Sequence, residues 1–507
     1  MIKDPNQTEK TSLDIKEVTG QSDVETIRPS SQNAREKILT EKRIPPLVIS
    51  FIIPTIIGMM VNAIYNVVDR FWIGRMDGQA TAMAGVGVTL SLTTIAFSFM
   101  VLIGIGSTAL ISLKLGERKQ KEAEQVLGNC ASLSFLSAAV IMVLGFIFVK
   151  PLLLLVGAGE ETLPYAMSYL GVLLSFNIIN SVQFSMSSVM RGVGQPVWAV
   201  MTQATGAVLN IILDPIFIFA PGPVNLFGWE LNLPFGLNMG VAGAALATGL
   251  SQTLSLLFCL FYYLSKRSPV HFHIRNLIPT LSIVLRILSI GISSFALQGA
   301  AAIVQAISTI QLKRFGGDIA ISAVTIVNTI AMFCIMPIIG INQGIQPIIG
   351  FNYGAKNYKR VRSTFIFAVF LASILTVGFG VIIQLFPHIF VRAFADDPEV
   401  IALSTYALKW TLLIMPLLGF QIVSANYFQF IGKSMVALVM TLLRQIIFLI
   451  PLYLVLPEIF SLNGIWFATP IADGLAVIVT TIVISWEIRK LSKRIKDQKT
   501  LSGVMIS

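Results

Sequence analysis

Residues 344–354 read GIQPIIGFNYG, and residues 106–116 read GSTALISLKLG. Each stretch begins and ends with glycine, and the two stretches have the same length. The offset from Gly106 to Gly344 equals the offset from Gly194 to Gly432, so further glycines recur in the same register. Two halves in register, each rich in apolar runs, indicate an internally duplicated membrane protein. Internal repeats of this kind are typical of secondary transporters, whose substrate site lies where the repeats meet.

The composition places the chain in a lipid bilayer. Hydrophobic residues make up 55% of the sequence and charged residues 12%, whereas soluble domains average about 25% charged residues. The apolar residues form continuous runs of membrane-spanning length. We therefore predict an all-α integral membrane protein with twelve transmembrane helices in two pseudo-symmetric six-helix lobes. The twelve runs are 47–73, 80–112, 125–149, 164–190, 197–219, 240–264, 284–312, 320–350, 364–386, 401–430, 436–456 and 463–487.

The distribution of Lys and Arg over the loops predicts the orientation. Alternate loops carry most of these residues, and cytoplasmic loops are the ones enriched in them. Both termini are therefore expected to be cytoplasmic, in a multi-pass protein of the cell membrane. The formal charge of +11 follows from this bias, and because the basic residues are scattered over short loops we expect no nucleic-acid partner. The basic loops include Lys114, Lys119, Arg191, Lys266, Arg275, Lys356, Lys359 and Lys433, followed by Arg489 and Lys490 near the end.

The polar segments divide the chain. Residues 1–44 lack an apolar core, so we predict a disordered cytoplasmic tail and no cleavable signal peptide. An N-terminal lobe over 45–265 and a C-terminal lobe over 283–488 follow, joined by a cytoplasmic linker at 266–282 and ended by a cytoplasmic tail at 489–507. The three histidines fall in loops or at a span end, and the three cysteines show no metal-ligand spacing. We therefore expect neither an enzyme with a histidine or metal centre at the bilayer nor any bound metal ion.

Two acidic residues stand inside apolar runs of the first half only. Asp69 follows Tyr65 by four residues, and Asp214 follows Asn210 by four, so each acid shares a helix face with a polar neighbour. Pro215 cannot donate a backbone hydrogen bond and can leave a carbonyl free near Asp214. These groups could form an oxygen-rich cluster for a monovalent cation or a shared proton. Acids in a membrane are costly and are usually functional, although Asp69 could instead snorkel or pair with Arg70.

Other embedded polar residues are open to two interpretations. Asp473, which follows Pro470 in the last run, could line a cavity of the second half or pair with polar groups of a neighbouring helix. Lys409 and Arg444 are expected to snorkel or to cap helices, with a functional role as the alternative. The sequence has no P-loop and no nucleophile elbow. The energy for transport would therefore have to come from an ion gradient or from a partner.

Four motifs together resemble the multidrug and toxic compound extrusion (MATE) exporters. Residues 340–355, GINQGIQPIIGFNYGA, resemble the signature of their eighth helix, and residues 191–196, RGVGQP, the loop after their fourth helix. Residues 210–217, NIILDPIF, and 243–248, GAALAT, resemble their fifth and sixth helices. The resemblance runs in order from about residue 45 to 488 and is strongest to the DinF-like branch, which includes MepA-type exporters.

The resemblance assigns roles to individual residues. In that branch a cation site lies in the N-terminal lobe, and by motif it corresponds to Asp69, Tyr65, Asn210, Asp214 and Thr248. A first-helix proline implicated in bending corresponds to Pro54, and Pro215 is a second bending candidate. The seventh helix offers Gln298 and Gln305 in place of the glutamate of another branch. A sodium site of that type is therefore not expected. Candidate cavity residues are Ser187, Gln298, Gln305, Gln343, Gln346 and Asp473.

The resemblance implies a V-shaped antiporter that rocks one lobe against the other. Its substrates would be small amphiphilic organic cations, exchanged for H⁺ or Na⁺, with no cofactor and a monomeric state. The alternative is a flippase of the wider superfamily that moves lipid-linked oligosaccharides. A flippase would be expected to place several Arg or Lys side chains in the cavity to hold a pyrophosphate. The sequence leaves both the choice of coupling ion and the identity of the drugs open.

Overall fold

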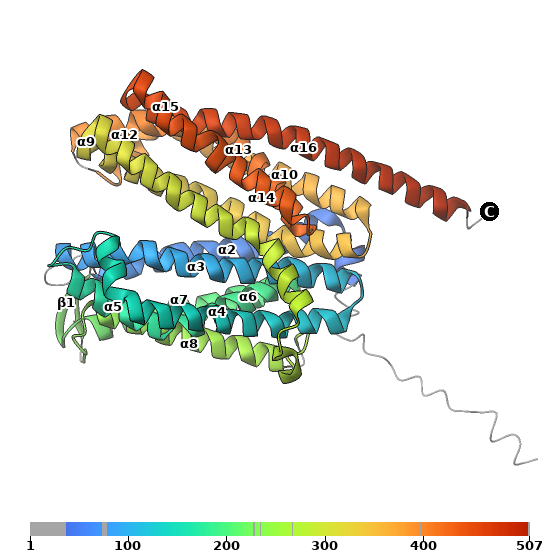
Figure 1. Cartoon of the computed structure of the whole chain (residues 1–507), viewed down its shortest axis with the longest axis horizontal. Coiled ribbons are helices and arrows are strands. Elements are labelled where there is room, and N and C mark those ends of the chain that lie inside the picture. The colour runs from blue at the N-terminus through green and yellow to red at the C-terminus, as the bar shows by residue number, and fades with distance from the viewer. Residues whose placement is uncertain are drawn as a thin grey trace, which may run out of the picture.

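The computed structural model describes residues 37–73, 79–226, 229–233, 235–265, 267–395 and 397–504. The described chain is helical apart from one short antiparallel hairpin, and its helices form two lobes that diverge from a common end (Figure 1). The prediction of an all-α membrane fold is confirmed. The elements are α2 (Ile44–Ile73), α3 (Gln79–Gly116), α4 (Gln120–Leu155), α5 (Leu163–Ser175), α6 (Asn177–Gly192), α7 (Pro196–Ile218), β1 (Gly222–Leu226), β2 (Trp229–Leu233), α8 (Val241–Leu264), η1 (Ile274–Leu277), α9 (Leu281–Gly354), α10 (Tyr358–Leu385), α11 (Pro387–Arg392), α12 (Pro398–Thr411), α13 (Met415–Phe430), α14 (Ser434–Leu442), η2 (Leu443–Leu449), α15 (Ile450–Phe460) and α16 (Leu462–Val504).

The number of spans agrees with the twelve apolar runs. Among the described residues, nine helical segments are long and apolar enough to cross a bilayer, and counting two bent helix pairs as one span each gives eleven. These pairs are α5 with α6, bent by 55°, and α12 with α13, bent by 52°. The twelfth span comes from α9, which is interrupted at Gly317 with φ 64° and ψ −158°. This backbone conformation is not helical, and only glycine adopts it readily. The 74 residues of α9 are therefore two helices joined at Gly317, and each of them is one span.

The sequence repeat corresponds to a repeat of backbone conformation. Gly194 and Gly432 both have positive φ, at 69° and 76°. Arg118 and Lys356, which are related by the same offset, are non-glycine residues with φ of 59° and 57°. A positive φ is rare outside glycine, so its occurrence at equivalent positions shows that the same helix-ending turn is built twice. The two halves therefore share local structure as well as sequence.

The lobes meet where the repeated glycines lie. A Cβ on Gly116 would meet the backbone oxygen of Phe351, and a Cβ on Gly354 would meet the backbone oxygen of Leu113. Leu113 and Phe351 are themselves equivalent positions of the two halves, so this contact between α3 and α9 is reciprocal. The missing side chains let the two helix backbones touch.

Helix α2 links the two lobes. Its first turns, including Leu47, Val48 and Phe51, are buried in the same core cluster as Ile341 and Ile345 of α9. Further along α2, the Thr55 hydroxyl donates a hydrogen bond to the carbonyl oxygen of Gly340 at 2.7 Å. The first span of the N-terminal half thus begins inside the core of the C-terminal half.

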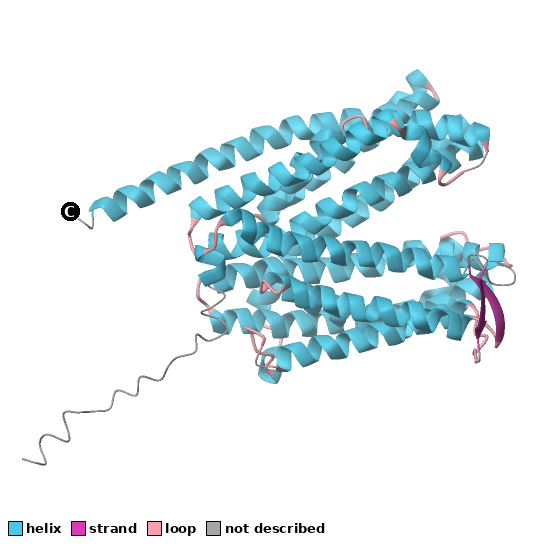
Figure 2. Cartoon of the chain, turned by 180° about the vertical axis from the view of Figure 1, so that it is seen from behind, coloured by secondary structure: helices cyan, strands magenta, loops and turns pink. Residues whose placement is uncertain are grey.

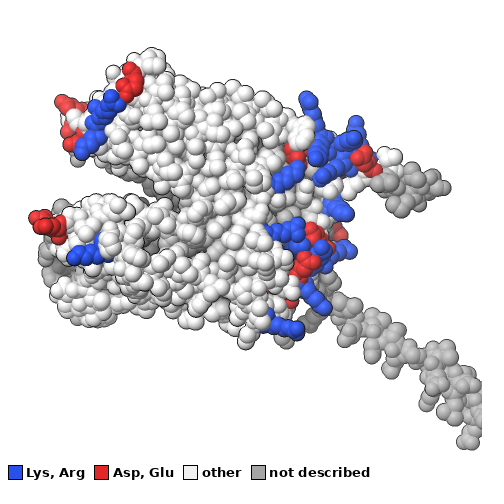
Figure 3. Space-filling view, viewed as in Figure 1, with Lys and Arg blue, Asp and Glu red and all other residues white. Residues whose placement is uncertain are grey.

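Lys and Arg side chains gather at the end where the lobes are joined, which we call the basic end (Figure 3). At the opposite end the two lobes are separated by a hollow, and the surface between the ends is almost free of charge (Figure 3). The C-terminal helix α16 projects past the lobes beside this basic end (Figure 2). It runs unbroken to Val504, so the predicted tail begins as a continuation of the last span.

The predicted N-terminal tail is only partly described. Residues 1–36 lie outside the described residues, but residues 37–41 are helical. Leu39 is buried, and its carbonyl oxygen accepts hydrogen bonds from Asn352 Nδ2 at 3.3 Å and Arg360 Nε at 3.1 Å. The prediction of disorder is therefore wrong for the last residues of the 1–44 segment, because they pack against α9 and α10.

Candidate functional site

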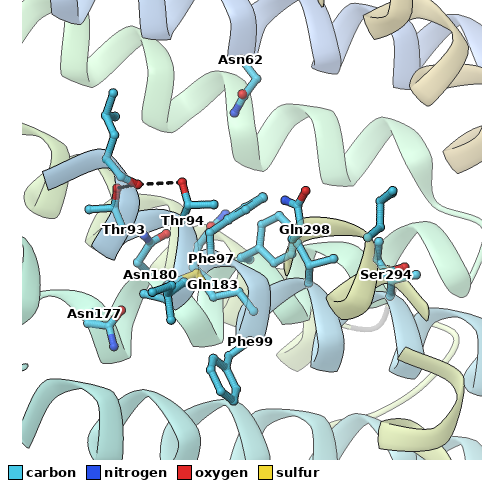
Figure 4. Close-up of a pocket in the computed structure, with 18 of the residues that line it drawn as sticks. Asn62, Thr93, Thr94, Phe97, Phe99, Asn177, Asn180, Gln183, Ser294 and Gln298 are labelled. Atoms are coloured by element: carbon cyan, nitrogen blue, oxygen red, sulfur yellow. Dashed lines mark hydrogen bonds between the residues drawn. The ribbon is translucent and has the colours of Figure 1, made fainter. Parts of the chain in front are cut away.

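A cavity of about 1660 Å³ lies between the two lobes. Its wall combines residues of α2, α3, α4, α5, α6, α7 and α8 with residues of α9, α13, α14 and η2. Figure 4 shows side chains such as Asn62, Asn180 and Gln298 around this space. Ligand pockets typically measure about 300–1,000 Å³, so the cavity has room for a drug-sized molecule together with water.

The cavity wall is apolar and aromatic, with many amides and few charges. Fifteen Asn and Gln side chains line it, and its aromatic residues include Phe97, Phe99 and Phe184. Among the described lining residues the only charged side chains are Arg191 and Arg444, and no carboxylate is present. Two cations are fewer than the several that a pyrophosphate-binding flippase was expected to show.

The predicted N-lobe residues come together at one side of this cavity. Asn210 Nδ2 donates to Asp214 Oδ1 at 2.9 Å and lies 3.4 Å from Thr248 Oγ1. The Tyr65 and Thr248 hydroxyl oxygens are 3.3 Å apart. Helices α2, α7 and α8 therefore supply one connected network, and Tyr65, Asn210 and Thr248 line the cavity.

The two acids stand differently in this network. Asp214 is fully buried, and its Oδ2 has no hydrogen-bond partner among the described residues. The Asn210 Oδ1 atom is also buried without a partner in that part of the chain. Asp69 lies within electrostatic range of both Tyr65 and Asp214. Arg70 is the alternative partner that the sequence offers to Asp69, and its side chain lies outside the part of the chain that the structure describes. Two carboxylates with amide and hydroxyl oxygens form a donor set for a proton or a hard cation.

Both bending candidates lie inside helices. Pro54 lies in α2 within the segment that packs against α9 of the C-lobe, ahead of the residues of the N-lobe cluster. Pro215 follows Asp214 in α7 and is buried. Each proline removes one backbone hydrogen bond from its helix. The α2 helix can therefore bend at Pro54, before it reaches the residues that join the N-lobe cluster.

The C-terminal lobe contains a buried ion pair. Arg444 Nε lies 2.5 Å from Asp473 Oδ1, with the Asp473 side chain 3% exposed and the Arg444 side chain 26% exposed. Nearby, the hydroxyl oxygens of Tyr453 and Thr469 are 3.1 Å apart. Of the two interpretations of Asp473, the structure thus shows the one in which it pairs with a neighbouring helix. The expectation that Arg444 snorkels or caps a helix is wrong, because a carboxylate on α16 holds it beside the cavity.

The six cavity candidates divide evenly. Gln298, Gln343 and Gln346 line the cavity. Ser187, Gln305 and Asp473 do not, and the expectation is corrected for these three. Ser187 is buried in the N-lobe core, Gln305 is exposed on the outside of α9, and Asp473 lies behind Arg444. Which side of its helix a residue occupies decides whether it lines the cavity. Arg444 and many of the lining Asn and Gln residues were missed as cavity residues, and their polarity inside apolar runs is the one sequence feature that could have identified them.

Two lobes of apolar helices around a largely apolar cavity, with a carboxylate cluster in the membrane-spanning part, define a multi-pass membrane transporter. A sequence model of the MatE family matches residues 54–216 and 280–455, so the chain belongs to the MatE family. Together with the relatives below, this makes it a multidrug exporter and not an enzyme.

Individual relatives agree with this assignment. The multidrug export protein MepA of Staphylococcus haemolyticus (strain JCSC1435) is 25% identical over 443 residues, which cover 86% of this chain and 92% of MepA. The solved MATE multidrug transporter DinF-BH, in complex with the dye rhodamine 6G, is 37% identical with a TM-score of 0.80, covering 89% of this chain and 97% of that one. An outward-facing multidrug resistance MATE transporter is 25% identical with a TM-score of 0.79, over 88% and 96%.

Proposed function

We propose that this chain exports amphiphilic organic cations in exchange for H⁺ or Na⁺, with Asp69 and Asp214 as the coupling acids. The observation that carries the proposal is the network of Tyr65, Asn210, Asp214 and Thr248 at the wall of the inter-lobe cavity. The multidrug export by MepA and the rhodamine 6G complex of DinF-BH support the substrate class. The aromatic side chains of the wall suit flat cations, because aromatic faces attract positive charge.

Helix α2 connects ion binding to movement of the lobes. Tyr65 and Asp69 at one end of α2 belong to the coupling cluster, and Leu47 at the other end is buried in the C-lobe core. Protonation of an acid, or entry of Na⁺, changes the charge of the cluster by one unit. If the two lobe arrangements differ in their affinity for that ion, its binding shifts the population between them. Bending at Pro54 would transmit the shift to the contact between the lobes.

The orientation follows from the charge bias. Because Lys and Arg gather at the basic end (Figure 3), that end faces the cytoplasm by the positive-inside rule. Both described chain ends lie at that end (Figure 1), so we infer cytoplasmic termini. The hollow then opens to the outside, and the structure corresponds to the state that releases drug. We further propose a monomer with lobes over 45–265 and 283–488 and a linker at 266–282.

The test is efflux from liposomes that contain the purified protein. Rhodamine 6G movement is recorded under an imposed proton gradient and, separately, under an imposed Na⁺ gradient of the same size. We expect one gradient to drive transport of the dye against its concentration difference. Dye movement that ignores both gradients would remove the antiport proposal while leaving the family assignment intact.

A further inference from the structure

Arg444 lies in a short segment of unusual backbone. Residues Leu443–Leu449 form a π-helix between α14 and α15, shortly before Pro451. Single π-helical turns inside α-helices often occur at functional sites. Arg444 and Gln445 of this segment both line the cavity. A buried ion pair gives little net stability, so its presence in a membrane calls for a functional explanation.

The guanidinium of Arg444 has donors to spare. A guanidinium carries five N–H groups in a planar fork, and the one hydrogen bond that the described residues give it runs from Nε to Asp473. Its two terminal nitrogens are left for another acceptor. Gln445 is 8% exposed, and its Oε1 has no hydrogen-bond partner in the described part of the chain. Of these two neighbouring groups, the guanidinium is the one with donors left for an anion within the described part of the protein.

The charge of the cavity favours an anionic group. No carboxylate lines it among the described residues, and Asp473 is screened from it by Arg444. The N-lobe acids lie on α2 and α7, on the other side of the space. A substrate with both charges could therefore place its cation against the aromatic wall and its anion against the C-lobe.

We propose that Arg444 and Gln445 form a subsite for the carboxylate of zwitterionic aromatic substrates, with Asp473 as the positioning residue for the guanidinium. The terminal nitrogens of Arg444 match the two oxygens of a carboxylate. The Nε2 group of Gln445 can donate to the same carboxylate, whereas its Oε1 is an acceptor and takes no part in holding an anion. The proposal deepens the proposed export function and rests on it, because it names a substrate class for the same cavity.

A matched pair of dyes tests the subsite. Rhodamine 6G is an ethyl ester with a cationic xanthene, and the free acid obtained by hydrolysing that ester carries the same cation and one carboxylate. The dissociation constants of both dyes are measured with purified protein by fluorescence polarisation. The quantity compared is the ratio of the two Kd values. In Arg444→Gln/Asp473→Asn, which removes the pair without leaving a lone buried charge, we expect the acid to weaken about tenfold or more relative to the ester.

The control is a second arginine–carboxylate pair of the same lobe. Arg314 Nη1 and Glu458 Oε1 are 2.5 Å apart, both side chains are more than half exposed, and neither lines the cavity. In Arg314→Gln/Glu458→Gln the Kd ratio should match that of the wild type. If the first double variant fails to fold, Arg444→Lys keeps the charge but loses the fork, and it should still weaken the acid relative to the ester. An unchanged ratio in every folded Arg444 variant would overturn the subsite, whereas wild-type protein that binds neither dye would overturn the proposed function itself.

Discussion

Asp214 is the residue whose surroundings are most demanding. It is fully buried, it accepts a hydrogen bond from Asn210, and its second oxygen has no partner among the described residues. A carboxylate in such a place must share a proton or bind a cation, because an isolated buried charge is very costly. We therefore expect the role of Asp214 to be ion coupling.

We predict that Asp214→Asn abolishes gradient-driven efflux while binding of rhodamine 6G is retained. The amide has the same shape and can still accept from Asn210, but it cannot take up a proton or neutralise a cation. Efflux is measured in liposomes under a proton gradient and a Na⁺ gradient, and binding by fluorescence. Asp318→Asn, at an exposed acid of α9, is the control. Efflux at the wild-type rate in Asp214→Asn would show that the coupling site lies elsewhere.

Substitution of the acids of the two lobes should affect transport in different ways. Asp473 pairs with Arg444 and does not line the cavity, so Asp473→Asn should change which drugs are exported and leave coupling intact. Asp69 lies within electrostatic range of Tyr65 and Asp214, so Asp69→Asn should weaken the export of every substrate. A panel of efflux rates under one gradient separates the two patterns. If Asp473→Asn stopped all transport and Asp69→Asn spared it, the coupling site would belong to the C-terminal lobe.

At the scale of elements, the contact between α3 and α9 depends on glycine. Gly116 and Gly354 bring the two backbones together at the basic end, and each would place a Cβ on a carbonyl oxygen of the partner helix. Overpacking of this kind costs about 1–3 kcal/mol. The pseudo-symmetry makes the two positions equivalent, so their variants should behave alike.

We predict that Gly116→Ala and Gly354→Ala lower the thermal melting temperature by similar amounts. The extra methyl group forces the lobes apart at their closed end. Melting curves of the purified protein provide the measurement. Gly87→Ala is the matched control in α3, because a Cβ at Gly87 would have open space around it. Wild-type melting in Gly116→Ala would mean that the helices can separate at no cost.

At the scale of the whole molecule, the charge bias predicts which side each loop faces. Lys119 and Lys359 are exposed at the basic end, and Asn225 lies in the β1–β2 hairpin near the opposite end (Figure 1). The three native cysteines are buried. A single new cysteine should therefore dominate labelling by a thiol reagent that does not cross membranes.

We predict that Lys119→Cys and Lys359→Cys react only from the cytoplasmic side and Asn225→Cys only from outside. The physical reason is that cytoplasmic loops retain Lys and Arg during insertion. Labelling is compared between intact cells and inverted vesicles, with the wild type as background. Reaction of Lys119→Cys in intact cells would reverse the orientation and make the structure inward-open.

The sequence alone determined the twelve apolar spans, the duplication with its evenly offset glycines and the position of two acids in one half. These features depend on composition and spacing along the chain, which hydropathy reads directly. The sequence also predicted that Tyr65 lies beside Asp69 and Asn210 beside Asp214, because residues four apart share a helix face.

Only the tertiary structure decided which residues pair with one another, which line the cavity and which helices pack together. It placed Arg444 on Asp473, put Gln298 on the cavity wall and Gln305 outside it, and set the start of α2 in the core of the other lobe. All sides of a membrane helix are apolar, so hydropathy gives little information on how a helix is rotated or which helix it meets. Close packing of small residues and contacts between polar groups of distant spans fix these choices, and such contacts exist only once the helices have assembled.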